Sequence, residues 1–304
     1  MRNLSHMFLI FTVTADKSRK YGTFDQLHTK KQYNTLLRFV EGVFSMILAI
    51  DMGNSNIVVG GLDDNKTYFE ERITTDDRKT SLEYAILLKN ILEIHKVKKN
   101  DIEGSIMASV VPPLNAPISS AVKKITGKKP LLVGSGMKTG LNIKMDNPKT
   151  VGGDRIVAAV AANAKYKGPI IIADMGTATT LDVVDHDGNY IGGVILPGVK
   201  VALNSLVSNT AQLPRISFDV PKRAIGKNTI ECMRNGIMLG NAAMLDGLID
   251  RMTAELGEEA TLIATGGMAR FITPLCTHKI TYDPDLLLRG LMILYRQNTE
   301  TKDA

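Results

Sequence analysis

The sequence predicts an α/β protein made of two related halves that face one cleft. A short apolar run, residues 47–50, ends abruptly in Asp51 and a small polar turn, as a buried strand does when it enters a tight loop. A second copy of this plan begins at Pro169, and its acid, Asp174, lies 123 residues after Asp51. Each copy is followed by two β-prone runs divided by polar turn formers, which is typical of a β-hairpin.

The two predicted hairpins occupy matching positions in the two halves. They comprise residues 57–62 and 67–73 in the first half, and residues 181–184 and 190–196 in the second. The spacing between the copies is far too long for a solenoid repeat. Backbone amides left free in each acidic glycine turn can hold an anion, so both turns are candidate phosphate-binding loops.

Between the two copies, helical and strand patterns alternate. Thr80 and Glu83 fit a capping box, and an apolar stripe predicts a helix that covers a sheet and continues through His95. Residues 105–111 then predict a strand, residues 114–126 a second helix, and residues 130–133 a short strand. This alternation indicates α/β architecture with mixed sheets. The stripe of the first helix consists of Leu82, Ile86, Leu87, Ile91 and Ile94.

The segment over residues 140–155 has a loop-like composition and ends in Gly152, Gly153, Asp154 and Arg155 before an alanine-rich helix over 156–165. In the simpler interpretation, Asp154 is the N-cap of that helix. In the functional interpretation, its carboxylate faces a cleft, the glycines let a substrate approach the backbone, and Arg155 supplies a forked donor. These residue types by themselves allow both interpretations.

The composition is that of a globular chain with room for about two domains. Hydrophobic residues make up 44% and charged residues 22%, and no apolar run reaches the ~20 residues of a membrane helix. The net charge of +6 is concentrated in residues 1–45, which carry seven basic and three acidic residues. The nearly balanced remainder argues against a nucleic-acid partner. We therefore expect neither a nucleic acid nor a membrane as partner.

Cysteine and histidine usage indicates no disulfide framework and no metal cluster. Cys232 and Cys276 lack CxxC spacing, which favours buried, reduced thiols in a cytoplasmic protein. The five histidines show no metal-ligand spacing. The chain also lacks the GxxxxGK[ST] motif, which disfavours a P-loop kinase.

Residues 1–45 differ in character from the rest of the chain. An apolar run over residues 7–13 faintly resembles a signal peptide, but it is short and is followed by a mixed basic segment. Because Met46 directly precedes the first strand, we expect residues 1–45 to be a disordered or untranslated extension, with a targeting segment as the alternative. The first half then covers residues 46–165, and the second covers residues 166–304.

Six motifs, in order and at compatible spacing, resemble those of type III pantothenate kinases. They cover residues 50–56, 109–114, 152–155, 174–180, 192–198 and 226–229. The resemblance extends essentially from Met46 to the end of the chain. It implies two duplicated ribonuclease H-like (actin-like ATPase) domains with mixed sheets flanking a central cleft. It also implies ATP-dependent phosphorylation of pantothenate to 4′-phosphopantothenate, the first step of coenzyme A biosynthesis.

The resemblance assigns the nucleotide to the two acidic turns. Asp51 would hold the hydrated Mg²⁺ that accompanies ATP, because Mg²⁺ prefers carboxylate and water ligands. Asp174 matches the position of a monovalent cation, K⁺ or NH₄⁺. The glycine turn at residues 265–267 suits the nucleoside side, although a plain strand-to-helix turn explains it equally well. The implied ATP-binding residues are Asp51, Met52, Gly53, Asn54, Ser55, Asn56, Ile57, Val58 and Thr177.

The resemblance assigns the acceptor to the segment around Asp154. This residue matches the general base that takes the proton of the pantothenate hydroxyl. Met145 stands where the family commonly has a substrate-contacting tyrosine, so one hydroxyl donor is missing. Ser55 replaces a threonine and Gly153 an alanine, and both changes are mild. The implied substrate-binding residues are Met145, Gly152, Gly153, Asp154, Arg155 and Thr229.

The resemblance further implies a cytoplasmic homodimer whose substrate pocket lies near the partner subunit, and residues 229–250 could supply the interface or merely core. Two alternatives remain. One is a non-catalytic regulatory or transcription accessory protein on the same fold, since fold does not determine function. The other is a kinase for a different small hydroxyl substrate, which Met145 keeps open. Retention of Asp51, Asp154 and Asp174 favours the enzyme.

Overall fold

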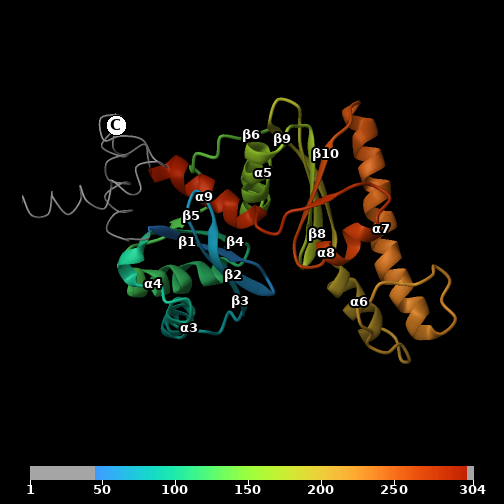
Figure 1. The fold of residues 1–304 in the computed structure, drawn as a ribbon, viewed down its shortest axis with the longest axis horizontal. Coiled ribbons are helices and arrows are strands. Elements are labelled where there is room, and N and C mark those ends of the chain that lie inside the picture. Colours follow the sequence, from blue (N-terminus) through green and yellow to red (C-terminus); the bar gives the residue numbers. More distant parts are fainter. Residues whose placement is uncertain (1–44, 300–304) are drawn as a thin grey trace, which may run out of the picture.

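The computed structural model describes residues 45–299, which fold into two α/β halves on either side of two central helices (Figure 1). The prediction for residues 1–45 lies outside the described residues, apart from Ser45.

The first half contains a five-stranded mixed sheet in the order β3-β2-β1-β4-β5. Its central strand β1 pairs antiparallel with β2 and parallel with β4, and β2 and β3 form the predicted hairpin. The strands are β1 (Met46–Met52), β2 (Asn56–Leu62), β3 (Thr67–Thr74), β4 (Ile102–Ser109) and β5 (Leu131–Leu132).

The second half contains a six-stranded sheet in the order β11-β10-β7-β8-β9-β6. Strand β7 pairs antiparallel with β8 and parallel with β10, as β1 does with β2 and β4. Strands β7 to β11 therefore repeat the first sheet strand for strand, and the predicted duplication is confirmed. The strands are β6 (Asn142–Ile143), β7 (Ile170–Met175), β8 (Ala178–Val184), β9 (Asn189–Pro197), β10 (Thr261–Thr265) and β11 (Thr281–Tyr282).

Helices α3 (Ser81–Ile94) and α4 (Asn115–Thr126) pack against one face of the first sheet. The capping box of α3 is confirmed, because Thr80 Oγ1 accepts from Glu83 N and Glu83 accepts from Thr80 N. The predicted apolar stripe is largely wrong, since Leu82 is 60% and Ile94 is 71% exposed. The helix is instead rotated to bury Tyr84, whose hydroxyl donates to the Asp76 carbonyl at 2.8 Å.

Helices α5 (Gly153–Lys165) and α9 (Leu286–Thr299) lie between the two sheets (Figure 1). One side of α5 packs Val157 and Val160 with β1, β4 and α9, and the other side packs four alanines against β7. The small side chains of α5 allow it to be covered on both sides. Its first turn is therefore held at the place where the strands of both halves end.

Helices α6 (Val199–Ser208), α7 (Thr229–Leu256) and α8 (Ala269–Ile272) cover the opposite face of the second sheet. Cys276 is half-buried against this core, whereas Cys232 on α7 is exposed, so the prediction of buried cysteines is wrong for Cys232. Four 3₁₀ turns complete the described structure: η2 (Lys99–Asp101), η3 (Pro112–Leu114), η4 (Pro148–Thr150) and η5 (Thr273–Leu275). Within residues 45–299, none of the helices combines the length and the apolar content that a membrane crossing requires.

The predicted division of the chain between residues 165 and 166 stays a prediction. Two elements pack with the sheet of the half to which this division does not assign them. Strand β6 precedes it but pairs with β9 of the second sheet. Helix α9 follows it but packs on β1 and β4 of the first sheet. Each predicted half thus supplies one element that packs with the sheet of the other, β6 in one direction and α9 in the other.

Candidate active site

Asp51 and Asp174 project from their sheets on the sides that face α5. Side chains alternate along a strand, and Ile47 and Ala49 of β1 belong to the cluster around α9 and α5, so Asp51 points the same way. By the same alternation Asp174 shares a face with Ile170 and Ile172 of β7, which pack on α5. The two predicted acids therefore face the layer between the sheets.

Asp154 enters this layer from the first turn of α5. Burial raises the pKa of Asp51 to about 7, with further increases from the charges of Asp154 and Asp174. Burial likewise raises the pKa of Asp174 to about 7, and Asp154 again contributes. Because the effect of one charge on another falls off with distance, the three acids lie within electrostatic reach of one another. The arrangement joins Asp51 to two acids that lie more than 100 positions later in the sequence.

The carboxylate of Asp154 lies close to the backbone of Gly152. The N-cap of α5 is Gly152, so the simpler interpretation of Asp154 as an N-cap is wrong. The amide of Arg155 donates to Asp154 Oδ1 at 2.8 Å, and a Cβ on Gly152 would lie only 2.5 Å from that oxygen. Burial raises the pKa of Asp154. A glycine at position 152 is therefore required for this carboxylate orientation.

The two acidic turns are closed in similar ways, although the second is one residue shorter, and they meet each other. The amide of Gly53 donates to the Asn56 carbonyl at 3.0 Å, and that of Gly176 to the Ala178 carbonyl at 2.9 Å. The hydroxyl oxygens of Ser55 and Thr177 lie 2.9 Å apart in a hydrogen bond. The structure thus brings together two of the predicted ATP contacts, one from each half.

The predicted ATP-binding residues differ in what they expose. Asn54, Ser55 and Asn56 have exposed side chains, whereas those of Met52 and Ile57 are fully buried in the core beneath α3 and α4. Met52 and Ile57 can therefore meet a ligand only through their backbones. Val58 is half-buried on the α9 side of the sheet.

Arg155 belongs to a buried polar network that sequence reasoning missed. Its Nε donates to Asp182 Oδ1 at 2.8 Å, and the same oxygen accepts from the hydroxyl of Tyr190. Asp182 is 1% exposed and also accepts from Thr180 at 3.1 Å. The sequence did carry a sign of this network, because Asp182 lies inside the apolar strand run 181–184. A carboxylate buried in such a strand requires hydrogen-bond or charged partners.

Met145 and Thr229 stand apart from this network. Met145 packs against the apolar cluster around α5, and its sulfur would lie 3.2 Å from a Cβ on Gly192. Thr229 is the first residue of α7 and is exposed, whereas Asn228 is the N-cap and accepts from Glu231 N at 2.9 Å. Within residues 45–299 no hydrogen bond or ion pair joins Thr229 to Asp154 or Arg155.

The carboxylates fit a metal ion that arrives with a nucleotide. In the described part of the chain, no three acid, histidine or cysteine side chains are grouped so that they could hold an ion by themselves. Mg²⁺ in kinases commonly takes one or two carboxylates and completes its shell with water and phosphate oxygens. Asp51, with Asp174 close by, offers such a donor set.

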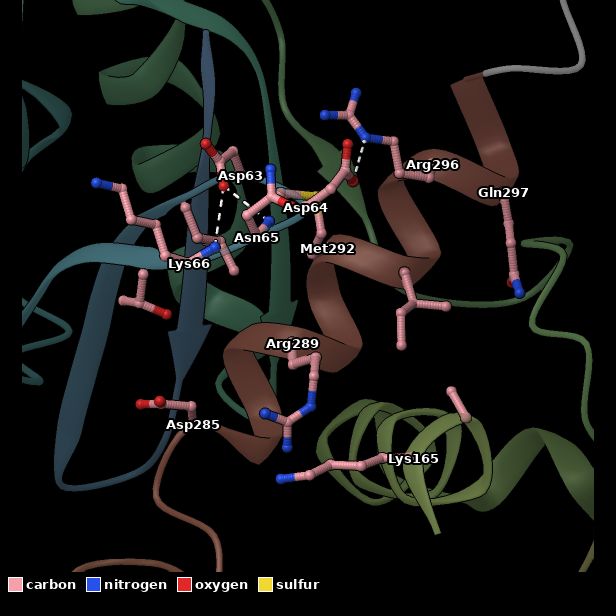
Figure 2. A pocket seen from close by; sticks show the side chains of 14 residues that line it. Asp63, Asp64, Asn65, Lys66, Lys165, Asp285, Arg289, Met292, Arg296 and Gln297 are labelled. Carbon is pink, nitrogen blue, oxygen red and sulfur yellow. Dashed lines mark hydrogen bonds and ion pairs between the residues drawn. The ribbon is translucent and has the colours of Figure 1, made fainter. Parts of the chain in front are cut away.

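A pocket of about 470 Å³ lies at the opposite end of β2 from the first acidic turn (Figure 2). It is formed by the turn between β2 and β3, the end of α5 and one side of α9. Figure 2 shows Lys165 and Arg289 reaching toward each other from the two helices, and Arg296 paired with Asp64. Asp51, Asp154 and Asp174 do not line this pocket, so it is separate from the candidate active site.

The sequence matches proteins of one family over most of its length. The family model described as type III pantothenate kinase matches residues 47–251. The type III pantothenate kinase of Exiguobacterium sibiricum is 46% identical over 253 residues, which cover 83% of this chain and 100% of that protein. The type III pantothenate kinase of Moorella thermoacetica is 42% identical over 254 residues, covering 84% and 100%.

Similarity to solved structures concerns the fold. MreB 5 of Spiroplasma citri, bound to AMPPNP, has a TM-score of 0.50 at 10% identity and covers 85% of this chain and 98% of its own. Component A of the (R)-2-hydroxyglutaryl-CoA dehydratase of Acidaminococcus fermentans has a TM-score of 0.51 at 14% identity, covering 84% and 99%. The predicted actin-like ATPase fold is thereby confirmed. By its sequence, the chain belongs to the type III pantothenate kinase family.

Proposed function

We propose that this chain transfers the γ-phosphoryl group of ATP to pantothenate, giving 4′-phosphopantothenate and ADP in the first step of coenzyme A biosynthesis. The observation that carries the proposal is that Asp51 of β1, Asp154 of α5 and Asp174 of β7 face the layer between the sheets, within electrostatic reach of one another, in a chain of this family. Phosphoryl transfer asks a protein mainly to position the reactants and to balance the charge on the phosphoryl oxygens.

In this proposal Asp154 is the general base. The pantothenate hydroxyl oxygen forms a bond to the γ-phosphorus, the bond from that phosphorus to the ADP oxygen breaks, and the hydroxyl proton passes to the Asp154 carboxylate. Burial raises the pKa of Asp154 above its ordinary value, which supports this role because it makes the carboxylate a stronger base. The Arg155 amide that donates to Oδ1 keeps the carboxylate in place.

The phosphates of ATP would lie between the two acidic turns. The exposed side chains of Asn54, Ser55 and Thr177 can donate to phosphate oxygens, and the glycine at position 53 lets them approach the backbone. Asp51 would hold the hydrated divalent metal, which balances phosphate charge when bound. We assign a monovalent cation, K⁺ or NH₄⁺, to Asp174.

Pantothenate would lie along the start of α5. Gly152 and Gly153 leave room there, and Asp182 holds the Arg155 guanidinium in one orientation. Met145 offers an apolar contact in place of the hydroxyl common in the family.

Because the reaction consumes ATP, we place the protein in the cytoplasm.

We further propose a homodimer in which Thr229 completes the substrate pocket of the partner subunit. Exposed apolar side chains on α6, on the segment that leads into α7 and on the first turn of α7 support an interface there. They are Val201 (42% exposed), Leu206 (39%), Val220 (62%), Ile225 (81%) and Ile230 (46%). Exposed apolar side chains gathered in one region are typical of protein interfaces.

The test is ADP release by the full-length chain with and without pantothenate, in potassium and then in sodium buffer. We expect turnover that requires pantothenate and is faster in potassium. Asp154→Asn should lower kcat by about 10²- to 10⁴-fold, the usual contribution of a positioned base. Asp187→Asn, which changes an exposed acid in the turn between β8 and β9, is the matched control and should leave kcat unchanged.

Absence of pantothenate-dependent ADP release, in protein that still binds ATP, would overturn the assignment. It would move the function to a different hydroxyl substrate or to a regulatory role. Full activity in Asp154→Asn would leave the reaction in place but remove Asp154 as its base.

A further inference from the structure

The first sheet carries a basic residue in line with Asp51. Asp51 pairs with Val58 across β1 and β2, and Val58 pairs with Arg72 across β2 and β3. Directly paired residues of antiparallel strands project on the same side of a sheet, so Arg72 shares a face with Asp51. That face is turned toward the second half of the molecule.

The guanidinium of Arg72 reaches across to the second half. Its Nη1 would lie 3.8 Å from a Cβ placed on Gly267, in the turn between β10 and α8. The charge of Arg72 also lowers the pKa of both Asp51 and Asp174, against the larger opposing effect of burial. Arg72 therefore lies within electrostatic reach of both acidic turns.

Arg72 is held in this position only loosely. Its Nη2 and Nε donate to one oxygen of Glu70, at 2.9 and 3.2 Å, and its side chain is 50% exposed. An exposed ion pair of this kind contributes little to stability. A phosphate group can displace it, because arginine binds phosphate oxygens through two parallel hydrogen bonds.

The acidic turns lack positive charge of their own. Residues 51–58 and 174–180 contain no lysine and no arginine. In the second half the position equivalent to Arg72 is Ile195, since Asp174 pairs with Thr180 and Thr180 pairs with Ile195. The fold therefore does not require a cation at this position, and the difference between the halves points to a ligand bound by the first half.

We infer that Arg72 is a nucleotide-binding residue that leaves Glu70 and binds the terminal phosphates of ATP between the two halves. This deepens the proposed function and rests on it for the identity of the nucleotide. The guanidinium would balance the charge that the terminal phosphates bring next to three carboxylates. It would also link β3 of the first half to the β10–α8 turn through the bound ligand.

The test is calorimetric binding of a non-hydrolysable ATP analogue, of ADP and of adenosine to the full-length chain, with Mg²⁺ and without pantothenate. Arg72→Ala should weaken binding of the triphosphate analogue by about 10- to 100-fold, as expected for loss of charged hydrogen bonds. Adenosine binding should stay unchanged, which also reports that the variant is folded. Arg72→Lys should lose part of the affinity, because lysine keeps the charge but not the fork.

Glu70→Gln is the matched variant that separates ligand binding from a structural role. If Arg72 acts on the nucleotide, releasing it from Glu70 should leave triphosphate affinity equal or tighter. The inference is overturned if Glu70→Gln reproduces the loss, if Arg72→Ala weakens adenosine as much as the triphosphate analogue, or if Arg72→Ala has no effect. Because no pantothenate is present, these results do not depend on whether pantothenate is the acceptor.

Discussion

The orientation of Asp154 depends on the absence of a side chain at position 152. A Cβ there would lie 2.5 Å from Asp154 Oδ1, which is closer than non-bonded carbon and oxygen atoms approach. The neighbouring glycine is different, because a Cβ on Gly153 would meet only Val133, at 3.6 Å and in ordinary contact. The two adjacent glycines thus have separate roles, one at the carboxylate and one at the helix start.

We predict that Gly152→Ala lowers kcat by about 100-fold, because a displacement of the reacting group of about 1 Å can cost that much. The KM for ATP should change little, since a Cβ on Gly152 would meet Asp154 and Arg155 and neither of the acidic turns. Gly153→Ala is the control and should keep kcat, because the family commonly has alanine at this position and the added Cβ would meet only Val133. It should raise the melting temperature slightly because alanine favours helix. Steady-state kinetics of both variants check this, and equal activity in the two would contradict it.

At the scale of elements, the two central helices are tied by one buried acid. Asp283, 4% exposed, accepts hydrogen bonds from Lys165 at 2.8 Å and Tyr166 at 2.6 Å near the end of α5, and from Arg289 of α9. Burial raises the pKa of Asp283, but these donors outweigh burial and hold it at about 2. The position of α5, and hence of Asp154, relies on this connection.

The depressed pKa predicts a loss of stability in acid. Asp283 binds its proton more weakly in the folded chain than in the unfolded chain, where its pKa is 3.8. Its contribution to the free energy of unfolding, about 2 kcal/mol, is therefore complete above pH ~4 and is lost as the pH falls toward 2. Denaturant unfolding between pH 6 and pH 2 measures it.

Asp283→Asn should remove this part of the pH dependence and destabilise the chain at pH 7, because Lys165 and Arg289 lose their shared anion. Asp219→Asn, which breaks an ion pair between Arg234 and a 67% exposed Asp219 side chain, should change the unfolding profile little. Identical acid profiles for Asp283→Asn and the parent chain would contradict the role of Asp283.

At the scale of the whole molecule, the proposed homodimer makes a prediction that a single chain cannot satisfy. Ile225 is 81% exposed in the segment before α7, and Ile94 is 71% exposed at the end of α3 in the first half. We predict that Ile225→Lys dissociates the dimer, because a charge in an apolar interface loses its hydration. Sedimentation velocity should show the parent chain at twice the mass of the variant.

Ile94→Lys is the matched control and should sediment as the parent chain does. If Thr229 completes the partner's pocket, Ile225→Lys should also raise the KM for pantothenate while nucleotide binding is kept. A parent chain that sediments as a monomer at micromolar concentration would contradict the homodimer.

The sequence by itself determined the local plan of each half. Apolar runs that end in Asp51 and Asp174, the turns after Leu62 and Val184, and the capping box at Thr80 depend on residues close together in the chain, so their patterns predict strands, hairpins and a helix start. The duplication followed from comparing these patterns, and the motifs identified the family.

Only the tertiary structure decided what lies between the halves. The apolar spacing of α3 allowed more than one buried face, and burial of Tyr84 selected the one observed. Likewise, the partnership of Asp182 with Arg155 and the reach of Arg72 toward Gly267 exist only after both sheets have packed against α5. Such contacts join residues far apart in sequence, and local patterns carry no record of which distant side chain will be the partner.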